Sequence, residues 1–521
     1  MTLAQILDQP SGSIAGLIRE HAKERPRHVA LVQDGRVVDF AGLDALMDRV
    51  AASLQRDGVK PRDSIAICAG TSIDYAAVFL GGLRAGIAVA PLAPSSTADS
   101  IASMAMDAGA SHLFLDAATS ATLDPAREKV VAKRIALDGS TAGMPLEDWL
   151  AAEGAKPKAT EIQPGWTFNI IYSSGTTGMP KGIEQPHLMR WLQIQRASLG
   201  GYGPDAVTLI ATPLYSNTTL VCFFPTLALG GTVVLMAKFD AAAYLALAAK
   251  HRVTHTMLVP VQYQRIMALP EFARHDLSSF RMKFCTSAPF AAELKADILK
   301  RWPGGLVEYY GMTEGGGTCI LAAHEHPAKL HTVGMPAPDH DVRVIDDAGR
   351  ELPRGEVGEI VGYSDATMLG YHNQPEKTAE AEWRDATGKR FIRTGDVGRF
   401  DADGFVTLMD RKKDMIISGG FNIYPSDLEA VLVGHPGVAE AAVVGMPSLR
   451  WGETPVAFVV PKSGATVTDA ELISWSNARL GKTQRVAAVE IVASLPRSAI
   501  GKVLKRELRD GYKERAKAQS L

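Results

Sequence analysis

The chain has 521 residues, of which 46% are hydrophobic and 21% are charged, as in a soluble globular protein with more than one hydrophobic core. Its 55 Lys and Arg residues nearly balance its 57 Asp and Glu residues. The resulting net charge of −2 argues against a general nucleic-acid-binding protein or a binder of anionic membranes. The four cysteines have no CxxC spacing, so we expect buried, reduced thiols of a cytoplasmic protein rather than zinc ligands or disulfides.

The N-terminal segment lacks the basic-then-apolar order of a secretory signal peptide. The most apolar stretch, residues 220–237, is long enough to raise the question of a membrane span. Pro225 and the pair Gly230-Gly231 interrupt this stretch, and the pattern predicts a buried helix, a turn and a strand. We therefore expect no integral membrane segment.

The first half of the chain alternates helical and strand-like patterns. Hydrophobic periodicity predicts helices at residues 40–55 and 75–86, and short apolar runs predict strands at residues 64–68 and 88–90. Further strands are predicted at residues 207–210, 231–236 and 253–258. Strand–helix–strand alternation indicates a parallel sheet with helices on its faces.

From about Asp339 onward the pattern changes to short strands joined by Gly-containing turns, as in an antiparallel sheet, with Asp403-Gly404 at one hairpin. A new α/β pattern follows the basic cluster Arg411–Lys413, where we place the domain boundary. The sequence thus predicts an α/β protein of two domains. Residues 1–410 form a large domain with parallel-rich sheets and a small antiparallel β subdomain, and residues 411–521 form a small α+β domain.

The stretch YSSGTTGMPKG, residues 172–182, is the strongest local signal for ligand binding. Successive glycines let backbone N–H groups converge on an anion, and Lys181 adds a positive charge. By itself this pattern also fits a flexible polar turn. It does not match the GxxxxGK[ST] loop of P-loop NTPases, because Pro180 precedes Lys181 and Gly182 follows it.

Four more motifs follow this loop along the chain: YYGMTE at residues 309–314, RTGD at 393–396, DRKKDMIISGGFNIYPSDLE at 410–429 and PRSAIGKVLKREL at 496–508. Together with the loop, they resemble the acyl-adenylate-forming superfamily of acyl-CoA synthetases, adenylation domains of peptide synthetases and beetle luciferases. The resemblance covers nearly the whole chain. It implies that a carboxylate attacks the α-phosphate of ATP, and that a thiol, usually that of coenzyme A, then attacks the acyl-AMP.

The resemblance also implies a nucleotide site and the residues that do chemistry in it. Lys502, Thr177 and Glu314 are the expected catalytic residues, and Glu314 is the expected Mg²⁺ ligand, as suits a hard carboxylate. The expected ATP- and AMP-binding residues are Ser174, Gly175, Thr176, Thr177, Lys181, Ser287, Ala288, Pro289, Tyr310, Gly311, Thr313, Asp396, Arg411 and Lys502.

A second set of positions is implied for coenzyme A and for domain movement. Gly419, Gly420 and Trp451 are expected to line the thiol tunnel, and Arg84 and Arg485 to contact the nucleotide phosphates of CoA. The alternative interpretation of Arg84 and Arg485 is that they are ordinary surface arginines. In the family the small C-terminal domain is mobile and rotates between the two half-reactions, and Lys413 matches the hinge position.

The acyl pocket is where this chain departs from the family pattern. The expected pocket residues are Tyr215, Ser216, Asn217, Gly311, Gly315, Gly316 and Gly317. Ser216 stands where many relatives carry a histidine, so Ser216 or Asn217 is the expected polar contact and Tyr215 the expected gate. The three glycines after Glu314 lack side chains that relatives place near the acyl group, which suggests a deeper pocket, unless they only shape the backbone.

The leading hypothesis is an ATP-dependent carboxylate–CoA ligase that uses Mg²⁺ and acts on an aromatic or medium-to-long-chain monocarboxylic acid. The alternative within the superfamily is an enzyme that loads an acyl group onto a carrier protein. A luciferase-type oxygenase and a non-catalytic nucleotide sensor are less favoured. We expect no nucleic-acid partner, and a homodimer is the default expectation.

Overall fold

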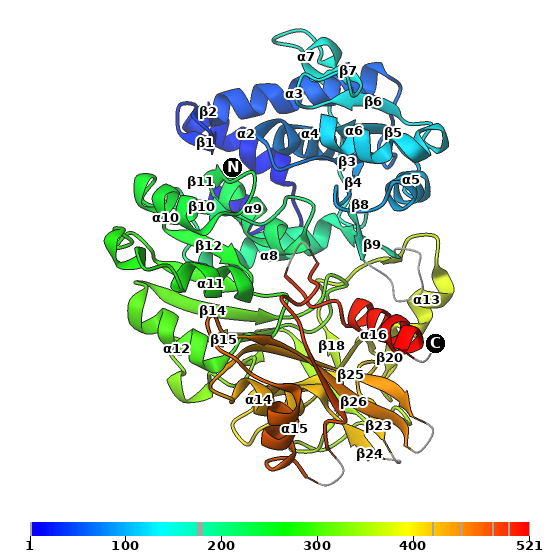
Figure 1. The fold of residues 1–521 in the computed structure, drawn as a ribbon. Helices are drawn as coiled ribbons and strands as arrows, with labels where there is room; N and C mark the ends of the chain where they lie inside the picture. Colours follow the sequence, from blue (N-terminus) through cyan, green and yellow to red (C-terminus); the bar gives the residue numbers. More distant parts are fainter. Residues whose placement is uncertain are drawn as a thin grey trace. The chain divides into compact units, whose positions relative to one another are not determined.

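The computed structural model describes residues 3–173, 181–418, 421–448, 451–481, 484–498 and 501–519, and its contacts divide the chain into two units. Unit 1 comprises Met1–Asp341 and Gly362–Ile392, and unit 2 comprises Val342–Val361 and Arg393–Leu521. Both units combine helices and sheets (Figure 1), so the predicted α/β class is confirmed. In this division residues 342–361 and 393–410 group with the C-terminal residues, whereas the predicted boundary and hinge near Lys413 stay a prediction.

The first large sheet of unit 1 has the order β19-β9-β8-β4-β3-β5-β6-β7. Its strands are Gly370–Tyr371 (β19), Lys181–Pro186 (β9), Thr167–Ser173 (β8), Ala88–Pro91 (β4), Ser64–Cys68 (β3), Ala110–Leu115 (β5), Lys133–Ala136 (β6) and Met144–Pro145 (β7). From β8 to β7 all neighbours run parallel, which confirms the parallel sheet predicted for the first half. Every residue of β3 is buried, as expected for a strand covered on both faces.

The second large sheet of unit 1 has the order β16-β15-β14-β13-β12-β10-β11-β1-β2. Its strands are Met335–Pro336 (β16), Cys319–Ala322 (β15), Gly305–Tyr310 (β14), Met282–Cys285 (β13), His255–Leu258 (β12), Val207–Ile210 (β10), Thr232–Leu235 (β11), Val29–Gln33 (β1) and Arg36–Asp39 (β2). The run from β14 to β1 is parallel, so its strands end at a common edge.

The helices of unit 1 connect these strands. They are Leu3–Leu7 (α1), Ile14–Glu24 (α2), Phe40–Arg56 (α3), Ile73–Arg84 (α4), Ala98–Asp107 (α5), Ala117–Leu123 (α6), Leu146–Trp149 (α7), His187–Ala197 (α8), Asn217–Ala228 (α9), Ala241–Lys250 (α10), Pro260–Met267 (α11), Ala292–Arg301 (α12) and Pro375–Glu380 (α13). Short 3-10 helices lie at Asp124–Lys129, Ser198–Gly200, Phe272–Arg274 and Pro327–Lys329. The predicted helices at residues 40–55 and 75–86 correspond to α3 and α4 and are confirmed.

The main hydrophobic core of unit 1 lies between the two large sheets. It joins side chains of the first sheet, such as Ile67, to those of the second, such as Ile210, through helices that include α4 and α9. Phe224 of α9 packs edge-on against Phe79 of α4 and Phe168 of β8, with ring centroids 5.4 and 5.0 Å apart. This packing anchors α9 in the core, and the first residues of the same helix belong to the site described below.

The apolar stretch at residues 220–237 forms the end of α9, a turn and β11, as predicted. Pro225 lies inside α9, and Gly230 has a φ of +83°, which explains why the chain turns there. No helix in the described ranges combines the length and apolarity that crossing a membrane requires. All four cysteines are buried and free, as expected.

Unit 2 contains most of the predicted antiparallel strands and the C-terminal α+β pattern. Asp341–Ile345 (β17), Gly358–Tyr363 (β18), Arg390–Phe400 (β21) and Glu382–Arg384 (β20) form one sheet in that order, and Val406–Arg411 (β22) pairs with β21. The boundary between the units falls within β17, β18 and β21, and β20 is counted in unit 1. The hairpin predicted at Asp403-Gly404 joins β21 and β22, which pair antiparallel, and is confirmed.

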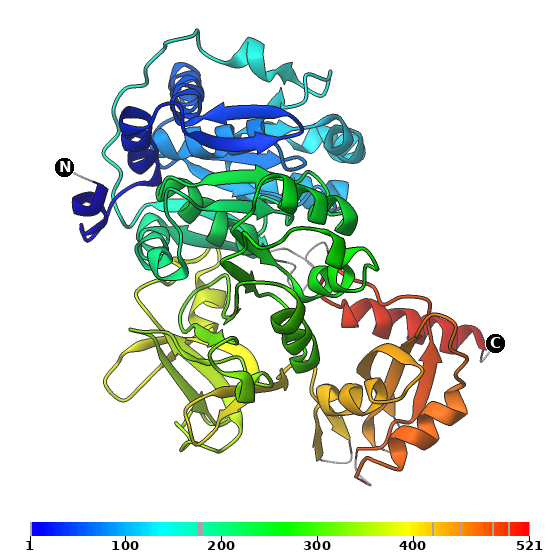
Figure 2. The same ribbon diagram turned by 90° about the vertical axis from the view of Figure 1, so that its left-hand side faces the viewer.

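The last sheet has the order β24-β23-β26-β25, with β27 beside β26. Its strands are Phe421–Ile423 (β24), Ile416–Ser418 (β23), Gly452–Pro461 (β26), Val438–Ser448 (β25) and Ala488–Ile491 (β27), and its helices are Pro425–Val433 (α14), Asp469–Asn477 (α15) and Lys505–Gln519 (α16). Leu428 of α14 and Leu472 of α15 belong to one hydrophobic cluster and Leu508 of α16 to another. The helices thus cover the two faces of this sheet, as Figure 2 shows.

Candidate active site

Three of the predicted site segments lie at one edge of the second large sheet. The segments 212–219, 286–290 and 311–317 follow β10, β13 and β14, which run parallel, and this edge is where α/β proteins commonly bind ligands. Oγ1 of Thr218 lies 2.5 Å from Oγ of Ser287, and Oγ1 of Thr286 donates to the Tyr309 carbonyl over 2.8 Å. The structure therefore brings together the predicted acyl and adenine segments.

Glu314 and Lys181, which come from different motifs, meet at the side chain of Tyr371. The Tyr371 hydroxyl donates to Oε1 of Glu314 over 2.9 Å, and Nζ of Lys181 lies 4.8 Å from the centre of the Tyr371 ring. Strand β19 places Tyr371 opposite Ile183 of β9. Burial and the carboxylate of Glu314 raise the pKa of Tyr371, so its hydroxyl remains a proton donor at neutral pH. The sequence analysis missed Tyr371, because a tyrosine outside the five motifs gave no signal.

The predicted phosphate-binding residues Ser174, Gly175, Thr176 and Thr177 lie outside the described residues, as do the predicted tunnel residues Gly419 and Gly420. The strands that flank the phosphate loop are described: β8 and β9 pair antiparallel, with Ser173 opposite Lys181. Lys181 is thus placed by regular strand pairing at the beginning of β9.

The predicted acyl residues Tyr215, Ser216 and Asn217 lie at the beginning of α9. Ser216 is only 7% exposed, while Tyr215 and Asn217 are partly exposed. Oδ1 of Asn217 accepts hydrogen bonds from Nη2 of Arg190 over 2.8 Å and from Nε2 of Gln185 over 3.4 Å. Asn217 is therefore a better candidate than Ser216 for a polar contact with the acid.

The structure argues against the deeper pocket that the sequence analysis attributed to Gly315 and Gly316. A Cβ added to Gly315 would lie 2.2 Å from the Ala366 carbonyl oxygen, and one added to Gly316 would lie 2.7 Å from that of Gly362. Both residues have positive φ, 77° and 83°. These glycines therefore allow close backbone packing beside Glu314, which was the alternative interpretation of the motif.

Unit 2 holds the predicted catalytic lysine together with the predicted ribose and hinge residues. Nε of Arg411 pairs with Oδ1 of Asp396 over 3.0 Å, and the two residues lie opposite each other on β22 and β21. Burial, followed by the charges of Arg411 and Lys413, lowers the pKa of Lys502 to about 8.

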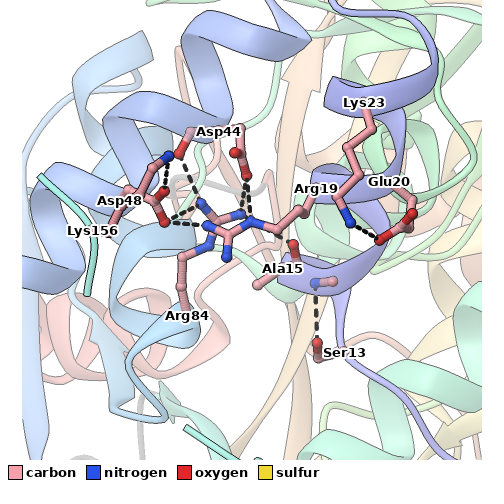
Figure 3. A network of polar contacts seen from close by, with 10 residues as sticks. Ser13, Ala15, Arg19, Glu20, Lys23, Asp44, Asp48, Arg84 and Lys156 are labelled. Carbon is pink, nitrogen blue, oxygen red and sulfur yellow. Dashed lines mark hydrogen bonds and ion pairs between the residues drawn. The ribbon is translucent and has the colours of Figure 1, made fainter. Parts of the chain in front are cut away.

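The predicted CoA contacts have different environments. Trp451 and Arg485 are exposed. Arg84 is only 8% exposed, and its guanidinium pairs with Asp44 over 2.6 Å and Asp48 over 2.8 Å (Figure 3). It also donates to the Ala15 carbonyl over 3.1 Å. A guanidinium so fully engaged inside the fold is not available to a phosphate, so we remove Arg84 from the candidate site.

Family models match both parts of the chain. The model described as "AMP-binding enzyme" matches residues 18–372, and the one described as "AMP-binding enzyme C-terminal domain" matches residues 427–502. The first match covers more than half of the chain and includes the phosphate loop, Glu314 and Tyr371.

Similar proteins agree with this assignment. A feruloyl-CoA synthase of an Amycolatopsis species is 35% identical over 94% of this chain and 96% of its own length. The fatty acid–[acyl-carrier-protein] ligase ScoC of Streptomyces coeruleorubidus is 32% identical over 94% of this chain and 95% of its own length. The ATP-bound crystal structure of MatB from Rhodopseudomonas palustris superposes with a TM-score of 0.85. It is 29% identical and covers 96% of this chain and 99% of its own. The chain belongs to the AMP-binding enzyme family, and it is an enzyme of the AMP-forming acyl-CoA synthetase class.

Proposed function

We propose that the protein is an ATP-dependent carboxylate–CoA ligase acting on an aromatic or medium-to-long-chain monocarboxylic acid. A carboxylate oxygen attacks the α-phosphorus of ATP and breaks its bond to pyrophosphate, which gives acyl-AMP. The sulfur of CoA then attacks the acyl carbon and AMP leaves, while the thiol proton passes to solvent. The observation that carries the proposal is the convergence of Lys181 and Glu314 on Tyr371 at the end of the phosphate loop.

Glu314 suits a Mg²⁺ ion that arrives with the nucleotide. Mg²⁺ is commonly held by one or two carboxylates together with substrate phosphates and water. Within the described residues no hydrogen bond engages Oε2 of Glu314, and Tyr371 orients the other oxygen. No group of three or more His, Cys, Asp or Glu suited to a metal occurs in the described ranges, so nucleotide oxygens would complete the coordination. Such an ion would neutralise the charge that develops on the leaving pyrophosphate.

The proposed nucleotide contacts come from both units, and each unit contacts different parts of the nucleotide. In unit 1, Lys181 carries a charge for the outer phosphates, and Ser287, Tyr310 and Thr313 follow or end strands at the ligand-binding edge of the sheet. In unit 2, the carboxylate of Asp396 can accept hydrogen bonds from ribose hydroxyls beside Arg411. Lys502 is the proposed cation at the α-phosphate during adenylation, and Lys413 the proposed hinge.

The acid class rests on the polarity around α9 and on the named relatives. Asn217 is the only polar side chain among Tyr215, Ser216 and Asn217 that is both partly exposed and hydrogen-bonded to a buried cation. The similarity to the feruloyl-CoA synthase supports an aryl acid as substrate, and the similarity to ScoC supports a fatty acid. Because one methylene changes binding by only about 1–3 kcal/mol, we expect several related acids to be accepted.

The acyl acceptor is the second open choice. CoA is the proposed acceptor, with Trp451 and Arg485 as exposed candidates for its contacts. The similarity to ScoC keeps a phosphopantetheinylated carrier protein as the alternative. Both acceptors present the same thiol, so only a direct comparison distinguishes them.

The test is a panel of aryl and aliphatic acids with ATP and Mg²⁺, measuring AMP and pyrophosphate. Acyl-CoA formation is measured in parallel with thioester formation on a carrier protein. We expect pyrophosphate release with at least one acid and transfer to CoA. Faster transfer to the carrier would favour the alternative, and no AMP or pyrophosphate with any acid would refute the ligase. Glu314→Gln serves as the inactive control.

A further inference from the structure

A buried arginine lies directly behind the proposed acyl site. Arg190 of α8 is 2% exposed, and Asn169 and Gln185, which flank it, are fully buried. Together with Asn217 they form a set of polar side chains that we name the amide network. Among the described residues Arg190 forms no ion pair with a carboxylate. Outside the amide network its guanidinium donates to Oε1 of Gln193 over 2.9 Å and lies 5.7 Å from the ring centres of Phe168 and Phe224.

Every partner of Arg190 in the amide network offers an amide oxygen. Its Nη2 donates to Oδ1 of Asn217 over 2.8 Å and to Oδ1 of Asn169 over 3.2 Å, and also to Oε1 of Gln185. A guanidinium has five N–H donors and no acceptor, so the oxygen of each amide must face it. The orientation of Asn217 is thereby fixed: its oxygen points to Arg190 and its NH₂ group points away. No hydrogen bond within the described ranges engages this NH₂ group.

The same network extends to the motif that contains Glu314. Nδ2 of Asn169 donates to Oε1 of Gln185 over 3.0 Å, so the Gln185 oxygen is occupied from two sides. Nε2 of Gln185 is then directed to the Thr313 carbonyl, 2.6 Å away. One guanidinium therefore determines the orientation of both Asn217 and Gln185, and through Gln185 it supports the backbone next to Glu314.

Burying a cation without an anionic partner is costly, and buried charges in proteins are generally paired. Arg84 in the same unit follows this rule, since two carboxylates contact it. Arg190 does not follow it, which leaves a positive charge with only dipoles and aromatic faces around it. An anion that binds beside the NH₂ group of Asn217 would supply the missing negative charge.

We propose that Arg190 is a positioning residue for the substrate carboxylate. It holds the Asn217 amide so that its N–H donates to the carboxylate, and its buried charge attracts that anion to the start of α9. This inference rests on the proposed function, because the anion is the acid of the adenylation step. Asn217 thus takes the polar role at the position next to Ser216, where many family members carry a histidine.

The decisive variant is Asn217→Asp, which keeps the shape of the side chain. A carboxylate at this position pairs with Arg190 but replaces the outward N–H by an oxygen that repels the substrate carboxylate. We expect the unfolding midpoint to rise by about 1 to 2 °C, because one ion pair shifts the midpoint only slightly in a unit of more than 300 residues. We expect the KM for the acid to rise about 10- to 100-fold, the range for a lost hydrogen bond to a charged group, with the KM for ATP unchanged.

Two further variants complete the test. Arg190→Met should raise the KM for the acid as strongly as Asn217→Asp, and Arg190→Lys should restore part of it, because the charge is kept but the forked donor is lost. Gln193→Ala is the matched control: Gln193 accepts from Nη1 of Arg190 over 2.9 Å without contacting Asn217 or Gln185, so the KM for the acid should not change.

The possible results separate this inference from the proposed function. If Asn217→Asp leaves the KM for the acid unchanged while ATP–pyrophosphate exchange continues, the inference fails and the ligase stands. A lower unfolding midpoint for Asn217→Asp would also overturn it, since a buried unpaired cation should gain from a carboxylate. If the wild-type protein forms no AMP with any acid, the proposed function fails, and the inference with it.

Discussion

Two buried arginines of unit 1 have opposite surroundings. Arg84 at the end of α4 is held by two carboxylates, Asp44 and Asp48, whereas Arg190 of α8 contacts only amide oxygens and aromatic rings. Burial alone would raise the pKa of Asp48, but Lys156, Arg84 and Arg19 outweigh burial and lower it. A cation whose charge is neutralised within the fold stabilises the fold, and a cation left without an anion can serve a ligand.

The same distinction applies to lysines that the sequence assigned to chemistry. Lys181 lies over the neutral ring of Tyr371, and Lys502 lies near two other cations, with Asp396 and Asp414 as weaker opposing charges. Neither forms an ion pair with a carboxylate within the described ranges. Each unit thus contributes a proposed functional lysine without an ion pair, as expected for an enzyme that binds ATP and a carboxylate.

The largest effect on stability should come from the paired cation. Arg84→Met removes the most buried cation that pairs with Asp44 and Asp48. The more exposed Arg19 and Lys156 remain beside these carboxylates, so the free energy of unfolding should fall by up to about 3–5 kcal/mol. Urea unfolding measures this loss, and Arg485→Met, at an exposed arginine, is the control, with an expected change within about 0.5 kcal/mol. A large rise in the KM for CoA at unchanged stability would restore Arg84 as a phosphate contact.

Removing an unpaired cation should reduce activity strongly while leaving stability nearly unchanged. Lys502→Ala should slow adenylation about 10²- to 10³-fold, by analogy with the loss of one oxyanion donor, and leave the unfolding midpoint near that of the wild type. Thioester formation from supplied acyl-AMP should remain. Equal losses in the two half-reactions would contradict a role for Lys502 in the first step alone.

A smaller effect is expected at Tyr371, which contacts both Lys181 and Glu314. Tyr371→Phe keeps the ring below Lys181 but removes the hydrogen bond that orients Glu314. The Mg²⁺ concentration for half-maximal exchange should rise about 10- to 100-fold, as for other residues that orient a metal ligand. Tyr363→Phe, which removes a hydroxyl bonded to Asp365, should not change the Mg²⁺ dependence.

The smallest effect concerns pH. With a pKa of about 8, Lys502 is cationic below that pH and loses its charge as the pH rises through it, so adenylation should decline on the alkaline side. Lys413→Gln removes one of the charges that lower this pKa, and the decline should move to higher pH. A pH–rate profile of ATP–pyrophosphate exchange measures the shift, and an unmoved profile would remove Lys413 from the environment of Lys502.

The sequence predicted the elements whose signal is local. Strands β3 and β10 occupy the predicted residues, because short apolar runs next to turns determine them without reference to distant parts of the chain. The residues Ser287, Tyr310 and Glu314 were likewise predicted from short sequence motifs, and the structure places them at or near one edge of the sheet.

What the sequence could not predict depends on contacts between distant segments. Arg84 was predicted to contact CoA, with a surface arginine as the alternative, because its partners Asp44 and Asp48 lie on another helix and gave no local signal. Arg190 and Tyr371 carry no motif, and their meaning depends on residues that come together only in the folded chain. For Gly315 the sequence showed a missing side chain but not that backbone fills the space.

The close packing at Gly315 and Gly316 limits how this enzyme can acquire new substrates. Any larger residue there would collide with the backbone at Gly362 or Ala366, so mutation on that side damages the fold before it alters selectivity. Changes in selectivity are then left to the side of the proposed acyl pocket that Tyr215 and Asn217 would form. These two positions differ in how far they tolerate substitution. Tyr215 can be replaced by residues of other sizes, whereas Asn217 is needed to accept the hydrogen bond from Arg190.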